Sequence, residues 1–253
     1  MEMKAKTRSK NKTSDRGKIH FFHGSKADDR QVANKTDYQQ TLFADEVKAS
    51  STMKMRIVIT WVPDGARKNF RKTTLKFPPE IKRTKEAKYS NVHMVDKLGI
   101  YENLKGQTCE IYDTIHTRIP DDVVAVIGAS LGHAVEYWQS RYLYQLESAI
   151  REAMDNHRGQ MDIVMDYPPF DIIDDVLIMC NNLVKDGYEI QWYTIAPSRH
   201  IPELQVHDFI VGLDYDIVTG GITNNPDVNS MHENDQKRLT NVIEWLKSRR
   251  KSR

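Results

Sequence analysis

Cysteine is scarce in this sequence: Cys109 and Cys180 are the only two among 253 residues, and they form no CxxC pair. That leaves no disulfide framework and no four-cysteine zinc site. Long apolar runs are also missing, since none approaches the roughly 18–20 residues that cross a bilayer. The polar, basic amino-terminal stretch lacks the apolar segment of a secretory signal. We therefore expect an intracellular protein without a membrane span, in which both thiols are reduced and buried.

Acidic residues are few at both ends of the chain and concentrated in its middle. Residues 1–99 carry 23 Lys and Arg against 11 Asp and Glu, residues 100–235 carry 7 against 23, and residues 236–253 carry 7 against 1. Basic segments of this kind typically lie in solvent and contact phosphate, acidic protein surfaces or the chain's own acidic part. The basic side chains expected to bind partners are Lys4, Arg8, Lys10, Arg67, Lys68, Arg71, Lys72, Arg249 and Arg250.

The apolar pattern predicts an α+β or α/β protein, with a small mixed sheet packed on two or three helices. We expect residues 1–51 to form a mostly disordered basic arm, residues 52–246 a single domain, and residues 247–253 a basic tail. The domain divides into a part rich in strands and loops (52–119) and a helix-helix-strand-strand core (120–246). β-Branched and alternating residues predict strands at 55–62, 106–117, 161–166, 188–196 and 206–213, with 73–77 as an extended partner of the first. Helical spacing predicts helices at 170–186 and 236–247.

The stretch Asp121–His157 is compatible with two structures. Apolar residues recur at helical spacing throughout it, which favours one long helix. Gly128 and Gly132 each weaken a helix by about 1 kcal/mol relative to Ala, which favours a strand at 123–127 followed by a helix from about Leu131. The sequence leaves both possibilities open.

The second possibility matters because Gly128-Ala129-Ser130-Leu131-Gly132 matches G-x-S-x-G. Over about sixteen residues it resembles the nucleophile elbow of α/β-hydrolases, in which a strand, a strained turn and a helix expose a serine hydroxyl. This resemblance implies Ser130 as nucleophile, His207 or His232 as base, and Asp166 or Asp214 as the acid that orients the base. No oxyanion segment precedes the motif. A serine hydrolase or acyl transferase is therefore the alternative function.

Two further patterns were weighed as metal sites. Asp214 and Asp216 are expected on one face of a strand, near Asp162 and Asp166, where paired carboxylates can hold a divalent cation for phosphate chemistry. His20 and His23 place two imidazoles three residues apart, short of the four ligands of a zinc site. Ordinary solvated carboxylates explain the first pattern more simply, so we expect no metal and no cofactor.

Residues 146–213 resemble a small helix-helix-strand-strand unit that recurs in uncharacterised and virion-associated proteins of large nucleocytoplasmic DNA viruses. The matching positions are Ala149, Ile150, Ala153, Gly159, Leu183, Gly187 and Tyr188. The resemblance covers about a quarter of the chain and brings no catalytic residue with it. It implies a structural or packaging-associated role.

Charge pattern and resemblance together predict a non-enzymatic structural or interaction protein, such as a minor capsid-associated component of a virus particle. Its basic ends would contact other subunits of an assembly, or nucleic acid without sequence preference, because arms that order on contact wrap large surfaces. The expected location is the cytoplasm or the virion.

Overall fold

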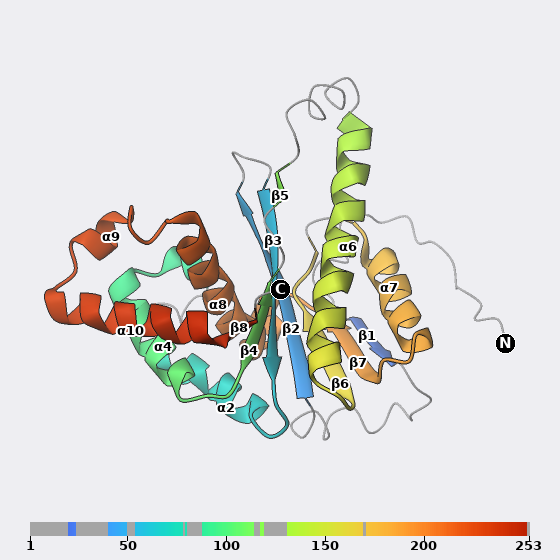
Figure 1. Ribbon diagram of the computed structural model, residues 1–253, viewed down its shortest axis with the longest axis horizontal. Helices are drawn as coiled ribbons and strands as arrows, with labels where there is room; N and C mark the ends of the chain where they lie inside the picture. Colours follow the sequence, from blue (N-terminus) through green and yellow to red (C-terminus); the bar gives the residue numbers. More distant parts are fainter. Residues whose placement is uncertain are drawn as a thin grey trace.

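A mixed β-sheet forms the centre of the molecule, with helices on both of its faces (Figure 1). The computed structural model describes residues 20–23, 40–49, 54–77, 79, 88–113, 117–118, 131–168 and 171–251. Within these residues the strand order is β1-β7-β6-β2-β3-β4-β8, and β5 pairs with β3.

One half of the sheet is antiparallel and consists of β2 (Gln40–Ala49), β3 (Lys54–Val62) and β4 (Glu110–Asp113). The β-branched and aromatic residues of β3 suit a strand that is buried on both faces. β5 (Thr117–Arg118) pairs with the start of β3, and β8 (Arg250–Lys251) runs parallel to β4.

The other half is parallel. β6 (Met161–Met165) lies beside β2, and α7 (Ile173–Lys185) connects it to β7 (Ile190–Ile195). β1 (His20–His23) pairs antiparallel with β7. The chain leaves β2 toward the antiparallel β3 but leaves β6 toward the parallel β7, so the direction of the strand order reverses between β2 and β6. β6 ends at Met165, which pairs with Ala44, whereas β2 continues to Ala49.

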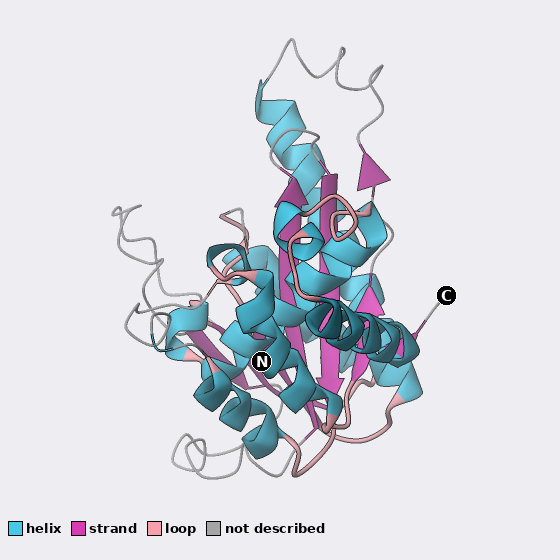
Figure 2. Cartoon of the chain, turned by 90° about the vertical axis from the view of Figure 1, so that its left-hand side faces the viewer, coloured by secondary structure: helices cyan, strands magenta, loops and turns pink. Residues whose placement is uncertain are grey.

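Helices form a layer on each face of the sheet. α6 (Leu131–Asn156) and α7 cover one face. The other face carries α2 (Arg67–Lys72), α4 (Met94–Lys105), α8 (Pro202–Thr219), α9 (Pro226–Asn229) and α10 (Glu233–Arg249). Figure 2 views the molecule from this second layer, with its helices in front of the sheet. Short turns η4 (Thr73–Lys76), η5 (Tyr89–Asn91) and η6 (Ser198–His200) complete the described elements.

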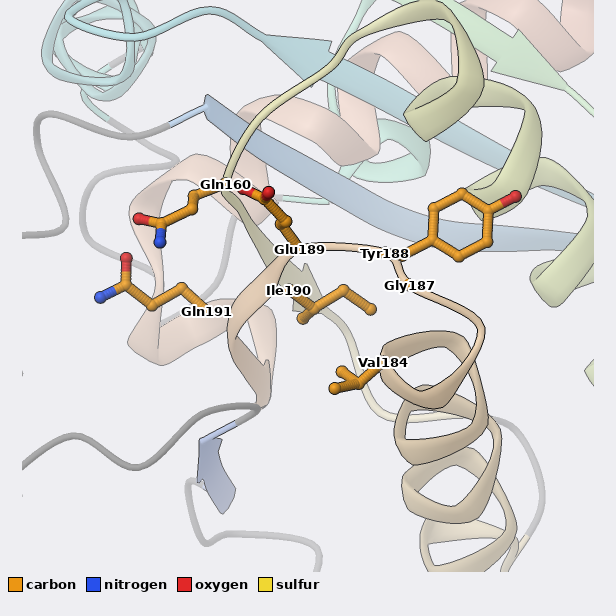
Figure 3. Close-up of a pocket in the computed structure, with 7 residues that line it drawn as sticks. All are labelled: Gln160, Val184, Gly187, Tyr188, Glu189, Ile190 and Gln191. Carbon is orange, nitrogen blue, oxygen red and sulfur yellow. The ribbon is translucent and has the colours of Figure 1, made fainter.

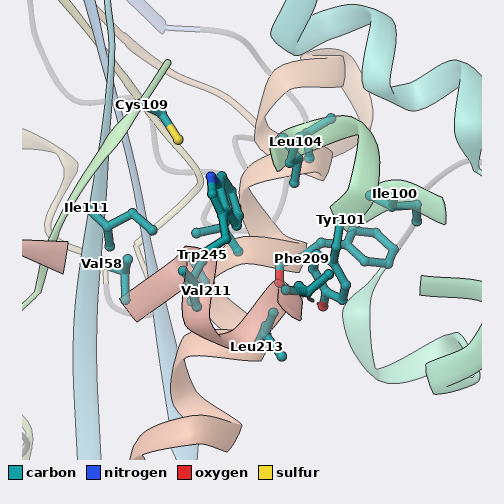
Figure 4. Close-up of a cluster of buried hydrophobic side chains, with 14 of the residues drawn as sticks. Val58, Ile100, Tyr101, Leu104, Cys109, Ile111, Phe209, Val211, Leu213 and Trp245 are labelled. Atoms are coloured by element: carbon teal, nitrogen blue, oxygen red, sulfur yellow. Dashed lines mark hydrogen bonds between the residues drawn. The ribbon is translucent and has the colours of Figure 1, made fainter. Parts of the chain in front are cut away.

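Each face of the sheet has its own hydrophobic core. Leu42 and Ala44 of β2 belong to the core under α6 and α7, whereas Phe43 belongs to the core under α8, because side chains alternate along a strand. Figure 4 shows the second core, in which Phe209 of α8 lies beside Tyr101 of α4, and Val58 of β3 lies beside Ile111 of β4. Full burial of each such side chain contributes about 1.5–3 kcal/mol.

The predicted fold class is confirmed: a mixed sheet packs against helices. Strands at 55–62, 161–166 and 188–196 and helices at 170–186 and 236–247 are confirmed, with ends shifted by a few residues. The strand predicted at 106–117 is represented by β4 and β5. Both cysteines are free and buried, as expected. No helix in the described ranges is long and apolar enough to span a bilayer.

Three predictions of secondary structure or boundary are wrong. Residues 206–213 are helical within α8, so the last strand of the helix-helix-strand-strand order is absent; Pro202 starts this helix and Gly220, at φ 72°, ends it. Residues 73–76 form a 3₁₀ turn instead of an extended partner. The boundary at residue 51 cuts off a central strand, because Gln40–Ala49 is β2.

The basic carboxyl-terminal segment also differs from the prediction. α10 continues to Arg249, and Arg250 and Lys251 form β8. The disordered character predicted for the first residues concerns a segment outside the described ranges, apart from β1. The choice between one helix and a strand before Leu131 also remains open, since residues 119–130 lie outside them.

Candidate functional site

Three aspartates gather where β2 and β6 meet, at the carboxyl end of β6. Ala44 of β2 pairs with Met165 of β6, so Asp45 and Asp166 follow at neighbouring positions. Asp45 shares a sheet face with Phe43, and Asp166 shares the same face with Val164, both in the core under α8. Asp208 comes from α8, which packs across this face. We call Asp45, Asp166 and Asp208 the aspartate cluster.

Asp45 is the buried member of the cluster, with 8% of its surface exposed. Burial raises its pKa well above the ordinary value, and the negative charges of Glu46, Asp166 and Asp208 raise it further, whereas Lys88 lowers it. Its Oδ1 accepts a hydrogen bond from the backbone N–H of Glu46 at 2.8 Å. From the described residues, Oδ2 accepts none. The carboxylate therefore has spare acceptor capacity in a place where negative charge is unfavourable.

Asp166 is held in place by the backbone around it. Its Oδ1 accepts hydrogen bonds from the N–H of Tyr167 at 2.8 Å and of Ser198 at 3.2 Å. Ser198 follows β7, so this carboxylate ties together the carboxyl ends of the two parallel strands. The remaining oxygen, Oδ2, lies 3.5 Å from the Lys88 ammonium.

Asp208 fixes the segment that carries Lys88. Its Oδ2 accepts a hydrogen bond from the backbone N–H of Tyr89 at 2.6 Å. The Tyr89 hydroxyl donates a hydrogen bond to Asp216, which lies on α8 as Asp208 does. Burial together with Asp216 raises the pKa of that hydroxyl. The Lys97 ammonium lies 3.4 Å from the centre of the Tyr89 ring, and burial lowers the pKa of Lys97 to about 8.

The arrangement suits recognition of a cation and a phosphate together. Carboxylate oxygens are preferred ligands of Mg²⁺, which is commonly held by one or two carboxylates and completed by substrate phosphate and water. Among the described residues, no three Asp, Glu, His or Cys side chains converge as a ready-made metal cage. The cluster does place carboxylates beside the ammonium of Lys88, which lies 3.3 Å from the Ser198 hydroxyl.

The serine triad suggested by the sequence is not assembled around His207. Its Nδ1 is 3.0 Å from the Thr60 hydroxyl and its Nε2 is 3.1 Å from the Val58 carbonyl. It is fully buried, and burial lowers its pKa to about 3, so it is a neutral core residue. Asp166 makes the contacts given above instead of orienting this imidazole. Ser130 lies outside the described residues.

The other acids and bases considered from the sequence have structural partners. Asp214 and Asp216 lie on α8 instead of a strand. Asp214 is paired with Arg56 at 2.9 Å and Arg250 at 3.1 Å. Asp162 is buried at the opposite end of β6, where burial raises its pKa to about 6 despite Arg67 nearby. The His232 side chain accepts a hydrogen bond from Asn234 N–H at the start of α10.

Several basic residues predicted to bind partners instead stabilise the fold. Arg67 is buried, and its guanidinium and that of Arg71 contact Glu203 at 3.2 and 2.7 Å. Arg250 pairs with Asp214, while Arg249 ends α10. Lys68 and Lys72 are exposed on α2, which follows β3 in the chain (Figure 1). Lys4, Arg8 and Lys10 lie outside the described residues.

Two surface hollows of the described part of the chain lie at the amino ends of β6 and β7. One of about 260 Å³ is lined by Gln160, Val184 and the turn Gly187–Gln191, where α7 leads into β7 (Figure 3). The other, of about 310 Å³, is lined in part by Asp155, His157, Arg158 and Glu189. Neither of the two is lined by a member of the aspartate cluster.

Sequence reasoning found Asp166 but missed Asp45, Asp208 and Lys88. Asp45 lies in the predicted arm, although the alternation in Thr41–Glu46 is compatible with a strand. Asp208 lies in a predicted strand, although Pro202-Glu203 is a typical helix start. Nothing in the sequence shows that Lys88 faces Asp166, because that contact joins positions 78 residues apart.

Comparison with known proteins gives no independent assignment: no protein-family model matches the chain, and no curated protein matches it significantly.

Proposed function

We propose that the protein is a divalent-cation-dependent phosphoryl-transfer enzyme that cleaves phosphodiesters at the aspartate cluster. The observation that carries the proposal is the position of Asp45, a buried carboxylate that follows Ala44 of β2 as Asp166 follows Met165 of β6. Burial and the charges of Glu46, Asp166 and Asp208 raise its pKa. Buried like charges are stable only when one is protonated or a cation neutralises them. A magnesium ion would supply that charge.

In this proposal Asp45 and Asp166 would hold one Mg²⁺. When bound, the ion would supply Lewis-acid chemistry to the phosphoryl group and to the attacking water. The water oxygen attacks phosphorus, the opposite P–O ester bond breaks, and the leaving alkoxide takes up a proton. The proton lost by the water passes to a cluster carboxylate and then to solvent. The products are an alcohol and a phosphomonoester.

Positive charge near the same edge supports a polyanionic substrate such as nucleic acid. Arg199 and His200 are exposed directly after Ser198. The pairing of His20 with Ile195 places the start of β1 at the carboxyl end of β7. The basic residues 1–19 precede that position in the sequence. Phosphate contacts from Lys and Arg provide binding that ignores sequence and weakens with salt.

The test is hydrolysis of bis(p-nitrophenyl) phosphate, with Mg²⁺ or Mn²⁺ and with EDTA. We expect metal-dependent release of p-nitrophenol by the wild type, and a loss of about 10²–10³-fold or more in Asp166→Asn. Asp64→Asn, the same change in an exposed turn after β3, is the matched control and should retain full activity. A wild-type protein that is inactive with both metals, or activity that survives in Asp166→Asn, would contradict the proposal.

The assembly role remains a separate proposal, which the charge of residues 1–19 favours. Deleting residues 1–50 would not test it, because β2 would be lost. Deleting residues 1–19 leaves every described strand in place. That variant should fail to form complexes with partner proteins or with nucleic acid at low salt. Normal complex formation would exclude residues 1–19 as the segment that contacts the partner.

A further inference from the structure

We propose that the two surface hollows at the amino ends of β6 and β7 form one binding site for an amphoteric small molecule with an apolar side chain, such as leucine. In this site Arg158 binds the carboxylate of the ligand and Glu189 binds its ammonium group. The inference is independent of the proposed function, because it uses neither a metal ion nor a residue of the aspartate cluster, which lies at the opposite end of β6.

The two hollows are adjacent, because one turn lines both of them. The hollow of about 310 Å³ lies against the end of α6 and that of about 260 Å³ against the end of α7, and Gly187, Tyr188 and Glu189 line both. In Figure 3, Glu189 and Gln160 lie at one end of the smaller hollow and Val184 at the other. Together the hollows offer a charged part and an apolar part, at a size that suits a small ligand.

Opposite charges border the larger hollow without partners of their own. Arg158 and Glu189 are both exposed and both line it. Among the described residues, neither the Arg158 guanidinium nor the Glu189 carboxylate makes a hydrogen bond or an ion pair. A ligand that carries both a carboxylate and an ammonium group satisfies both side chains, because hydrogen bonds between ionised groups are the strong ones. A simple anion or a simple cation would leave one of the two unpaired.

Hydrogen bonds join the two walls of the larger hollow. One wall is the end of α6 with the residues that follow it, and the other is the turn between α7 and β7. The Tyr188 hydroxyl donates to Asp155 Oδ1 at 2.9 Å, and the N–H of Met161 donates to the Glu189 carbonyl at 2.9 Å. The walls therefore keep their spacing without a ligand, and such preorganisation reduces the ordering cost of binding.

The wall that carries Arg158 is also fixed to the sheet. The ring of His157 stacks on the ring of Trp61 in β3, with centroids 3.6 Å apart. Trp61 Nε1–H donates to Gln40 Oε1 at 2.9 Å, and Gln40 Nε2–H donates to the Arg158 carbonyl at 3.0 Å. Gly159 then turns the chain toward β6 at φ 107°. These contacts set the point from which the Arg158 side chain leaves the backbone.

His157 adds a hydrogen-bond acceptor to the same hollow. Its Nε2 lies 2.8 Å from Glu110 Oε2. Burial raises the pKa of Glu110, but the hydrogen bonds that this carboxylate accepts lower it below the ordinary value. An ionised Glu110 takes the proton of Nε2 as a hydrogen bond, which leaves a lone pair on Nδ1. Because Nδ1 makes no hydrogen bond with the described residues, it is available to the ammonium group of the ligand beside Glu189.

The test is a nuclear magnetic resonance titration of the full chain with L-leucine, N-acetyl-leucine and leucinamide. We expect leucine to bind with a Kd of roughly 1 mM or tighter. N-acetyl-leucine lacks the ammonium group and leucinamide lacks the carboxylate. Each should bind about 10–100-fold more weakly, because one hydrogen bond between charged groups is lost.

Two variants assign the contacts. Arg158→Gln should bind leucine as weakly as it binds leucinamide, and Glu189→Gln should no longer distinguish leucine from N-acetyl-leucine. Lys185→Gln and Glu233→Gln are the controls, because each removes one exposed charge that lines neither hollow. Both controls should bind leucine like the wild type.

Three outcomes would overturn the inference: a wild type that does not bind leucine, a wild type with equal affinity for the three compounds, or leucine binding that survives in both Arg158→Gln and Glu189→Gln. None of them bears on phosphoryl transfer at the aspartate cluster. Conversely, a chain without phosphodiesterase activity that binds leucine with this pattern would confirm the site at the hollows alone.

Discussion

Asp45→Asn tests whether the charge of Asp45 lowers the free energy of unfolding while it is needed for the proposed activity. Asp45 is 8% exposed, and burial and the surrounding carboxylates oppose its ionisation. Asparagine has nearly the same shape but no charge, and its N–H group is attracted by the neighbouring carboxylates. A buried polar group without adequate partners costs about 1–3 kcal/mol, and a charge more. We therefore expect the variant to be about 1–3 kcal/mol more stable at pH 7.5, although it loses the proposed activity.

The pH dependence gives the prediction its sign. A carboxyl group with a raised folded pKa is protonated in both states below the unfolded value of about 4, so it costs nothing there. Its cost grows as pH rises from that value to the folded pKa, because the unfolded chain ionises there while the folded protein keeps Asp45 protonated. The advantage of Asp45→Asn should therefore be largest at pH 7.5 and shrink steadily as the pH falls toward 4.

Thermal unfolding followed by circular dichroism measures this effect. For a chain of this size, 1–3 kcal/mol corresponds to a rise in Tm of roughly 2–12 °C. Asp64→Asn, which changes an exposed carboxylate, should leave Tm nearly unchanged. A variant that melts below the wild type at pH 7.5, or an advantage independent of pH, would refute the view that Asp45 is a destabilised carboxylate.

Four further outcomes follow from single contacts. The wild type should lose roughly 2 kcal/mol of stability between pH 6.5 and 5, because the His207 imidazole, with its pKa lowered to about 3, resists protonation when folded. His207→Gln should remove this loss. Urea unfolding at both pH values measures the loss, and a variant that loses as much as the wild type contradicts the prediction. For Asp162 the pH dependence has the opposite sign, since a pKa raised to about 6 costs the wild type stability as the pH rises from 4 through 6. Asp162→Asn should therefore be more stable than the wild type at pH 7.5 and equally stable at pH 4. Gly212→Ala should clash with the Tyr89 ring, because a Cβ there would lie 2.2 Å from the ring carbon Cγ, and should cost about 1–3 kcal/mol; normal stability would refute this close contact. Cys109 and Cys180, whose thiol pKa values burial raises to about 12, should react with a disulfide reagent only after denaturation, and rapid labelling of the native protein contradicts that.

The elements that sequence patterns predicted well are those whose period is set by burial on one sheet face or one helix face. The helix at 173–185 and the strands beside it are local units with clear turn signals, such as Gly187 at φ 97°. Residues 206–213 are apolar on nearly all sides, because α8 lies between the sheet and two other helices. An all-round apolar run has no period that separates strand from helix.

The candidate site was the part that sequence could not reveal. Asp45 is in a polar, charged region that resembles an arm, and only its pairing with β3 and β6 makes it central. The cluster joins residues 45, 88, 166 and 208, which no local motif connects. Conversely, the local G-x-S-x-G match drew attention to His207, whose imidazole serves to connect α8 with β3.

The most direct test of the account is a crystal soaked in Mn²⁺ and measured at the manganese absorption edge. We predict one anomalous peak at bonding distance from carboxylate oxygens of Asp45 and Asp166, on the side next to Lys88, and no peak in crystals of Asp166→Asn. Crystals that bind manganese elsewhere, or not at all, would contradict the central claim that this reversal of the sheet is a cation-dependent phosphate site.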